Sequence, residues 1–272
     1  MPLDALGLAL AAAVVHAGWN VLLHGSDDVE ARTAAALALA VLVFAPVAAA
    51  TWSVQLRAAP YIAASAVFEI AYFALLVAAY KRRDLSVVYP VARGSAPVLV
   101  LIGSAIVLGT SVSAGETVGV LLVASGVLLV RGVRRGASGL PIALTIGCTI
   151  AAYTLIDKQG LHHATPIPYL ELTTAAVAVA LCSSLLVRRG SAPLRAQLGW
   201  TTFAAGVGSF CAYCLFLFAL RLAPAPGVAA VRETSVVFAA GLAALFLHER
   251  VTPSRLAGAG IVAGGVALLA LS

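Results

Sequence analysis

The sequence predicts an all-α integral membrane protein with ten transmembrane helices, arranged as two inverted five-helix repeats. The first supporting observation is composition: 62% of the 272 residues are hydrophobic and 10% are charged, whereas soluble domains usually carry about 25% charged residues. The second is that the chain divides into ten apolar runs, each close to the roughly 20 residues that a helix needs to cross a bilayer. The third is an internal repeat with an offset of 139 residues.

The predicted spans are bounded by glycine, proline or charged residues, and the loops between them are too short to hold a soluble domain. The first run follows "MPLD", which lacks the positive charge of a signal peptide, so we interpret it as a span. The ten spans cover about 3–23, 31–52, 58–80, 85–108, 114–131, 139–157, 166–187, 198–220, 225–247 and 253–271.

Span one carries His16, Trp19 and Asn20 at positions i, i+3 and i+4. This spacing places the three side chains on one face of a helix. They form either a stripe that contacts a substrate, with His16 as a proton-sensitive group, or a face that hydrogen-bonds to neighbouring helices.

Spans three and four are expected to form a hairpin that places Glu69 and Arg93 at similar depths. An arginine inside the membrane costs at least about 2.5–3.5 kcal/mol, so it requires a carboxylate, carbonyl groups or water. Arg93 either pairs with Glu69 to hold the hairpin or faces a cavity and binds an anionic group of the substrate. Pro90 and Pro97 flank Arg93 and either break the helix where it lines a water-filled cavity or kink it for packing.

Four spans carry a tyrosine that is expected either in a cavity wall or at the membrane interface as an anchor. Asp157 and Lys158 end span six and are expected to form an ion pair on the loop side. The tyrosines, on spans three, four, six and eight, are Tyr72, Tyr89, Tyr153 and Tyr213.

Span nine contains the adjacent charges Arg232 and Glu233, which point about 100° apart around a helix and are not expected to pair with each other. Arg232 follows Arg93 by 139 residues, which predicts matching charges on opposite walls of one site. The glycines of spans five and ten are expected to permit close helix packing, within the fold or in a homodimer. They are Gly115, Gly119, Gly126, Gly258, Gly260, Gly264 and Gly265.

The repeat divides the chain into residues 1–135 and residues 139–272, with five predicted spans in each part. Because five is odd, the second half enters the membrane in the opposite sense to the first. Inverted repeats of this kind are common in secondary transporters, whose sites lie near the membrane midplane between the halves. Alternating access requires two mirror-related states, which such halves provide.

Basic residues predict the orientation. The loops that join spans 1–2, 3–4, 5–6, 7–8 and 9–10 hold twelve Lys and Arg residues, and the other loops hold three. The positive-inside rule therefore places the first set of loops in the cytoplasm and both termini outside. The basic residues form no stripe with interleaved aromatic residues, so a nucleic-acid partner is not expected.

The sequence predicts a transporter and not an enzyme, because it shows no nucleophile–base set, metal-ligand cluster or phosphate-binding loop. No metal or cofactor is predicted, and the four cysteines are expected to be small buried residues. An intramembrane enzyme and a non-transporting membrane scaffold are the alternatives. Coupling to protons, exchange against a second substrate and uncoupled facilitation all stay open.

Two stretches, "RRDLSVVYPVARGSAP" (82–97) and "LFLHERVTPSRLAGAGIVAGGVALL" (245–269), resemble segments of the EamA-type transporters of the drug/metabolite transporter superfamily. Thr110 is the first-half counterpart of the acidic Glu249, so that half departs from the family pattern. The resemblance implies a cavity lined by spans one, three, four, six, eight and nine. It also implies a carrier of small polar or amphiphilic metabolites, often an exporter, in the cell's inner or plasma membrane. It places both termini in the cytoplasm, contrary to the basic residues. The two arginines, with Glu69 and Glu233, suit a zwitterion or an anion, such as an amino acid or organic anion, as the substrate.

Overall fold

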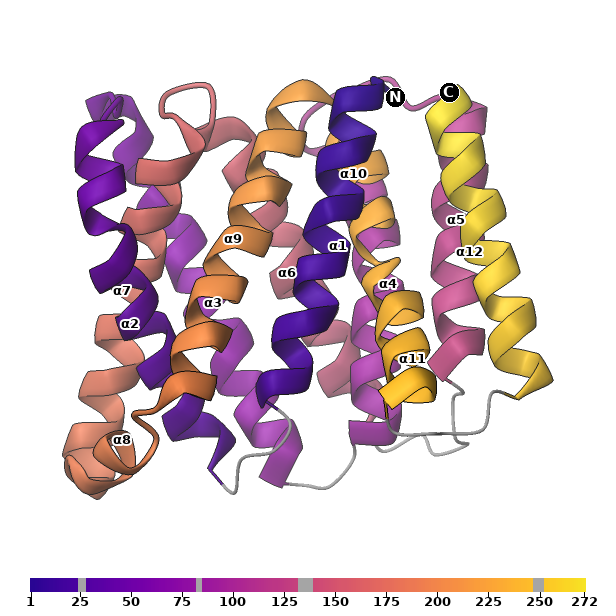
Figure 1. The fold of residues 1–272 in the computed structure, drawn as a ribbon. Coiled ribbons are helices and arrows are strands. Elements are labelled where there is room, and N and C mark those ends of the chain that lie inside the picture. The colour runs from indigo at the N-terminus through magenta and orange to yellow at the C-terminus, as the bar shows by residue number, and fades with distance from the viewer. Residues whose placement is uncertain (24–27, 82–84, 132–138, 247–251) are drawn as a thin grey trace.

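The computed structural model describes residues 1–23, 28–81, 85–131, 139–246 and 252–272, and nearly all of these are helical (Figure 1). The predicted acidic residue at Glu249 lies outside the described residues. The α-helices are α1 (Leu3–Leu23), α2 (Val29–Ala50), α3 (Ala59–Lys81), α4 (Leu85–Ile106), α5 (Ala114–Arg131), α6 (Leu140–Gly160), α7 (Pro166–Arg189), α8 (Ala192–Ala196), α9 (Trp200–Leu222), α10 (Ala225–Arg232), α11 (Ser235–Phe246) and α12 (Pro253–Leu271), with a 3₁₀ turn at Leu56–Ala58.

Seven of the described helices are long and apolar enough to cross a membrane: α1, α2, α3, α6, α7, α9 and α12. The apolar parts of α4 and α5, Pro90–Ile106 and Ala114–Val130, are shorter. The short helix α8 lies at the end of the molecule opposite to both termini (Figure 1). The all-helical fold and the positions of most predicted spans are therefore confirmed.

The ninth predicted span is not one helix. It is divided into α10 and α11 by a tight turn in which the backbone N–H groups of Glu233 and Thr234 donate to the carbonyls of Ala230 and Val231, each at 3.0 Å. The Thr234 hydroxyl also donates to the Val231 carbonyl, at 2.7 Å. Arg232 thus ends α10 and Glu233 precedes α11, and each charge opposes the partial charge of the helix end beside it.

The break predicted at Pro90 and Pro97 is wrong, because α4 continues through both prolines. A proline removes one backbone donor, and Pro97 cannot donate to the carbonyl of Arg93, four residues earlier. Packed neighbours allow a membrane helix to tolerate such a loss. The discontinuity near the arginines lies in the ninth span instead.

Helices far apart in the sequence pack side by side. Helix α3 of the first half packs on α6 of the second half, and α1 packs on α9 in the corresponding arrangement. Helix α4 contacts α6, while α1 contacts α10 and α11. Two further pairs, α2 with α7 and α5 with α12, close the bundle.

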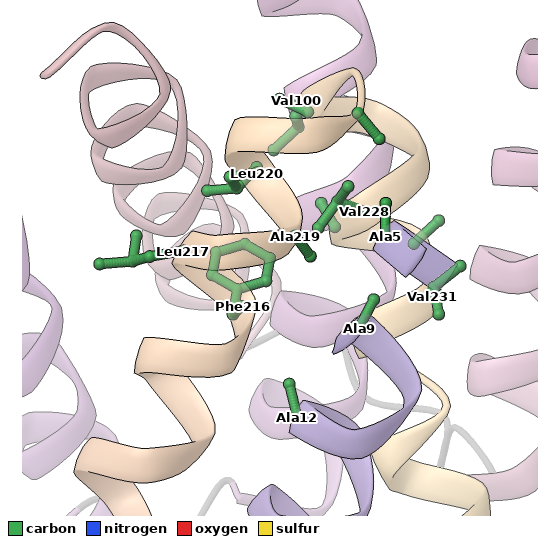
Figure 2. Packing of buried hydrophobic residues seen from close by; sticks show 14 of the residues in the cluster. Ala5, Ala9, Ala12, Val100, Phe216, Leu217, Ala219, Leu220, Val228 and Val231 are labelled. Carbon is green, nitrogen blue, oxygen red and sulfur yellow. The ribbon is translucent and has the colours of Figure 1, made fainter. Parts of the chain in front are cut away.

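Small residues allow α1 to approach the second half closely. Ala5, Ala9 and Ala12 follow one another at about one-turn intervals and are buried against α9 and α10 (Figure 2). Val228 and Val231 of α10 face this alanine row. Such a row lets two backbones come together where lipid supplies no hydrophobic driving force.

The α5–α12 seam consists of glycines that face one another. A Cβ added to Gly126 would lie 2.7 Å from the carbonyl oxygen of Gly258, and one added to Gly258 would lie 2.8 Å from that of Gly126. Gly119 and Gly265 face each other in the same way, at 3.2 and 2.9 Å. These four glycines therefore pack two helices of the same chain. Packing within the fold was one of the two roles that the sequence predicted for them, and packing in a homodimer was the other.

Candidate functional site

The helices enclose a cavity of about 220 Å³ that receives side chains from both halves of the chain. Most residues predicted for the site line it. They are His16, Trp19, Asn20, Glu69, Tyr72, Arg93, Tyr153, Tyr213 and Arg232. Helices α1, α3, α4, α6, α9 and α10 contribute these groups, while α2 and α7 add apolar wall through residues such as Leu37 and Val177.

Arg93 connects the two halves at the edge of this cavity. Its Nε atom lies 2.9 Å from Glu233 Oε2, and its Nη2 atom donates to the Ser235 hydroxyl at 3.2 Å. Arg93 and Glu233 are only 4% and 3% exposed, so each charge depends on the other. The predicted pairing of Arg93 with Glu69 is wrong, because the carboxylate that forms its ion pair among the described residues comes from the α10–α11 turn.

The ring of His16 is a further neighbour of Arg93. Its Nε2 atom lies 3.1 Å from Arg93 Nη2. A guanidinium group only donates hydrogen bonds, so Nε2 is the acceptor and the neutral ring carries its proton on Nδ1. A second proton on His16 would place two cations in contact, which argues against His16 as a proton carrier.

Arg232 lies on aromatic faces. Its Cζ atom is 5.0 Å from the ring centre of Tyr213 and 4.4 Å from that of Phe216. Both distances lie within the range of cation–π attraction. Among the described residues no carboxylate lies within ion-pair distance of Arg232, so its charge is available at the cavity wall.

Asp157 is a buried acceptor that sequence analysis misassigned. Its Oδ1 atom accepts hydrogen bonds from Ser65 at 2.5 Å and Tyr169 at 2.9 Å, and its Oδ2 atom accepts from Tyr213 at 2.5 Å. Asp157 is fully buried, and Lys158 instead donates to main-chain carbonyls of α9 and the segment after it. The predicted Asp157–Lys158 ion pair is therefore wrong.

The misassignment of Asp157 arose because α6 runs three residues beyond the predicted end of span six, to Gly160. A Cβ on Gly160 would lie 2.4 Å from the ring of Tyr169, so glycine is required for that tyrosine to reach Asp157. The sequence did contain one signal for a buried acid, because Asp157 is followed by Gly160, which leaves room for an aromatic ring. The partners of Asp157, on α3, α7 and α9, carry no sequence signal of their own.

The tyrosines form a connected wall. Tyr153 lies edge-on to Tyr72 on one side and to Tyr213 on the other, with ring centres 6.3 and 6.2 Å apart. Trp19 packs edge-on to His16 at 5.0 Å, and its buried Nε1 donor has no acceptor among the described residues. The side chain of Tyr89 lies outside what the structure describes.

Comparisons with known proteins agree with this architecture. The model of the EamA-like transporter family matches residues 137–271. Among solved structures, the crystal structure of a protein that is 14% identical superimposes with a TM-score of 0.78 and covers 98% of this chain and 95% of its own. At this identity the likeness establishes the fold alone. No curated protein matches the chain by sequence.

Proposed function

Residues 137–271 are an EamA-like transporter family domain, part of the drug/metabolite transporter superfamily, and from this premise we propose that the protein is a multi-pass secondary transporter. It moves a small polar or amphiphilic metabolite across the cell's inner or plasma membrane by alternating access, and no enzymatic step is proposed. The observation that carries the proposal is the cavity, in which Glu69, Trp19 and Arg232 face one space between the halves.

The packing of the helices supports an inverted repeat over residues 1–135 and 139–272. Exchanging each residue with its partner 139 positions away converts the Gly119–Gly265 contact into the Gly258–Gly126 contact, and both are present. The contact of Gly126 with Val262 converts into that of Gly265 with Val123, which is also present. An interface that is unchanged by such an exchange has a two-fold axis, and between antiparallel helices this axis lies in the membrane plane.

The cavity charges favour a zwitterion or an anion as substrate. The Arg93–Glu233 pair is neutral as a unit, which leaves Arg232 and Glu69 as the ionisable groups, among the described wall residues, that can pair with a charged substrate. Arg232 binds a carboxylate, Glu69 binds an ammonium group, and the Trp19 indole donates to a substrate oxygen. The tyrosines and the apolar wall of α2 and α7 accept an amino acid side chain or the carbon skeleton of an organic acid.

The test is transport by purified protein in proteoliposomes, screened over amino acids, organic acids and cationic drugs, with and without a pH gradient. We expect uptake of a zwitterionic or anionic compound. Arg232→Ala should lose at least tenfold in uptake, because it removes the cation for the substrate carboxylate. The fold should tolerate this change, because the aromatic partners of Arg232 need no counter-charge. Arg195→Ala, at an exposed position on α8, is the matched control and should transport normally. Transport of none of these compounds by the wild-type protein would contradict the proposal.

A further inference from the structure

The hydrogen bonds of Asp157 identify its ionisation state. Ser65, Tyr169 and Tyr213 each direct a hydroxyl group toward its two oxygens. An ionised carboxylate only accepts hydrogen bonds, and the 2.5 Å contacts from Ser65 and Tyr213 lie in the range of O–H···O⁻ bonds. Three donors, with no cation in contact in the part of the chain that the structure describes, therefore make Asp157 the anionic member of this region.

Glu69 has the opposite surroundings. It lies one helical turn after Ser65 on α3 and lines the cavity. Among the described residues it makes no hydrogen bond and no ion pair, but it interacts electrostatically with Asp157 and Arg232. A carboxylate in this position has no donor to stabilise it and has a neighbouring negative charge.

The charges around the two acids do not balance. Arg93 is neutralised by Glu233, His16 is neutral, and Lys158 points to the carbonyls of Leu220 and Ala223. Arg232 is thus the one cation left among the described residues that face the pair. The other titratable groups nearby are the tyrosines 72, 153, 169 and 213 and, on α7 outside the cavity lining, Glu171.

Two carboxylates and one guanidinium have a net charge of −1, and one bound proton makes the group neutral. In a poorly solvated site the neutral state is favoured, because an uncompensated buried charge costs several kcal/mol. Two acids that interact strongly share their protons as a pair. The hydroxyl donors hold Asp157 ionised, so the shared proton resides on Glu69.

We propose that Glu69 and Asp157 form a proton-binding pair, in which Glu69 carries a proton that the ammonium group of a substrate displaces. On binding, Glu69–COOH and R–NH₃⁺ give Glu69–COO⁻···⁺H₃N–R and one proton released to solvent, so charge is conserved. Binding of either species weakens binding of the other by the same factor, which is the requirement for proton–substrate exchange. This inference rests on the proposed transport function.

Infrared spectroscopy of the purified protein tests the proton without any substrate. A protonated carboxyl group has a C=O stretching band distinct from those of carboxylates. We expect the wild-type band at neutral pH to decrease in Glu69→Gln, whose side chain has no described bond to lose, and to be unchanged in Asp4→Asn, at an exposed position on α1. An unchanged band in Glu69→Gln would overturn the proposal.

The dependence of Glu69 on Asp157 is a second infrared test. Asp157→Asn removes the negative charge beside Glu69, so Glu69 should ionise against Arg232 and the same band should decrease. If this variant does not fold, Tyr213→Phe removes one donor from Asp157 and should shift the frequency of the band. A band that neither substitution alters would show that the two acids do not act as a pair.

Transport separates this inference from the proposed function. The probe is an equimolar mixture of labelled common amino acids in proteoliposomes. Wild-type uptake should change several-fold when the pH gradient is reversed, while Glu69→Gln, which lacks the carboxylate for the ammonium group, should show lower uptake that is insensitive to the gradient. Uptake that ignores the gradient in both proteins would overturn proton exchange and leave transport intact. No uptake by the wild type would count against the proposed function while the infrared result stands.

Discussion

Arg93 shows what can and cannot be predicted from the expected depth of a residue in the membrane. An apolar run with one arginine requires a partner, and Arg93 lies at the cavity, which is one of the two positions that the sequence left open. The partner was misjudged because Glu69 and Glu233 are both carboxylates inside the membrane, and the choice depends on which helices are neighbours. The α10–α11 turn brings Glu233 to 2.9 Å from Arg93, and no local pattern encodes that contact between residues 140 positions apart.

Arg93→Ala should therefore destabilise the fold, because it leaves the buried Glu233 carboxylate without its cation. A loss of about 3–5 kcal/mol is typical of a broken buried pair. The double variant Arg93→Met/Glu233→Met should recover most of this loss, since both charges are then absent. Thermal unfolding in detergent is the measurement, and equal unfolding temperatures for Arg93→Ala and the wild type would show that the pair contributes nothing.

The candidate site was largely predictable from residue type, because polar side chains inside apolar spans face the interior of the bundle or a cavity and not the lipid. His16, Glu69 and Arg232 all line the cavity as expected. Asp157 was not assigned to it, because its position near the end of α6 resembled a loop. Its role depends on hydroxyl groups of Ser65, Tyr169 and Tyr213, and such groups are ordinary in any membrane helix.

The break between α10 and α11 illustrates the limit at the level of elements. Hydropathy predicts one continuous span, because the segment is apolar on both sides of the charges. The turn contains no proline or glycine, and its signal is Thr234 and Ser235 before a new apolar run, the residue types that favour a helix start. Discontinuous helices are a feature of transporter sites. In an apolar span, a charged dipeptide followed by Thr-Ser is therefore a pattern that indicates a break in the helix.

Gly258→Ala should weaken the protein more than Gly260→Ala. The new Cβ at Gly258 would lie 2.7 Å from the Val130 nitrogen and 2.8 Å from the Gly126 carbonyl oxygen, both backbone atoms that cannot rotate away. At Gly260 nothing lies within 4 Å. Overpacking typically costs 1–3 kcal/mol, and thermal unfolding measures it. Equal unfolding temperatures for the two variants would contradict the close approach of α5 and α12.

At the scale of the whole molecule, the apolar runs were enough to predict an all-helical membrane fold, because helices satisfy the backbone hydrogen bonds of such runs where water is absent. The order of the helices in the bundle was not predictable in the same way. Pairings such as α1 with α9 depend on rows of alanine and glycine, which are abundant throughout this chain. Under the proposed inverted repeat, each pairing implies its counterpart in the other half, which would constrain the order.

The orientation of the protein in the membrane can be tested in intact cells. Both termini lie at one end of the bundle, and α8 lies at the other (Figure 1). If the basic end is cytoplasmic, a cysteine at Ser53, between α2 and α3, should react with a membrane-impermeant maleimide in intact cells. A cysteine at Ser191, beside α8, should react only after permeabilisation. The four native cysteines are replaced first, and the reverse labelling pattern would place both termini in the cytoplasm.

The seam of α5 and α12 makes the same contacts when the halves trade places, so tilting toward one face of the bilayer strains it as much as tilting toward the other. In the proposed alternating-access cycle, a substitution there should speed or slow both strokes together. In the proposed cycle, a preference for import or export would then originate in contacts that have no counterpart in the other half. The contact of Arg93 with Glu233 and Ser235 is of this kind, because Gly94 and Ala96 stand where the counterparts of these two partners would be.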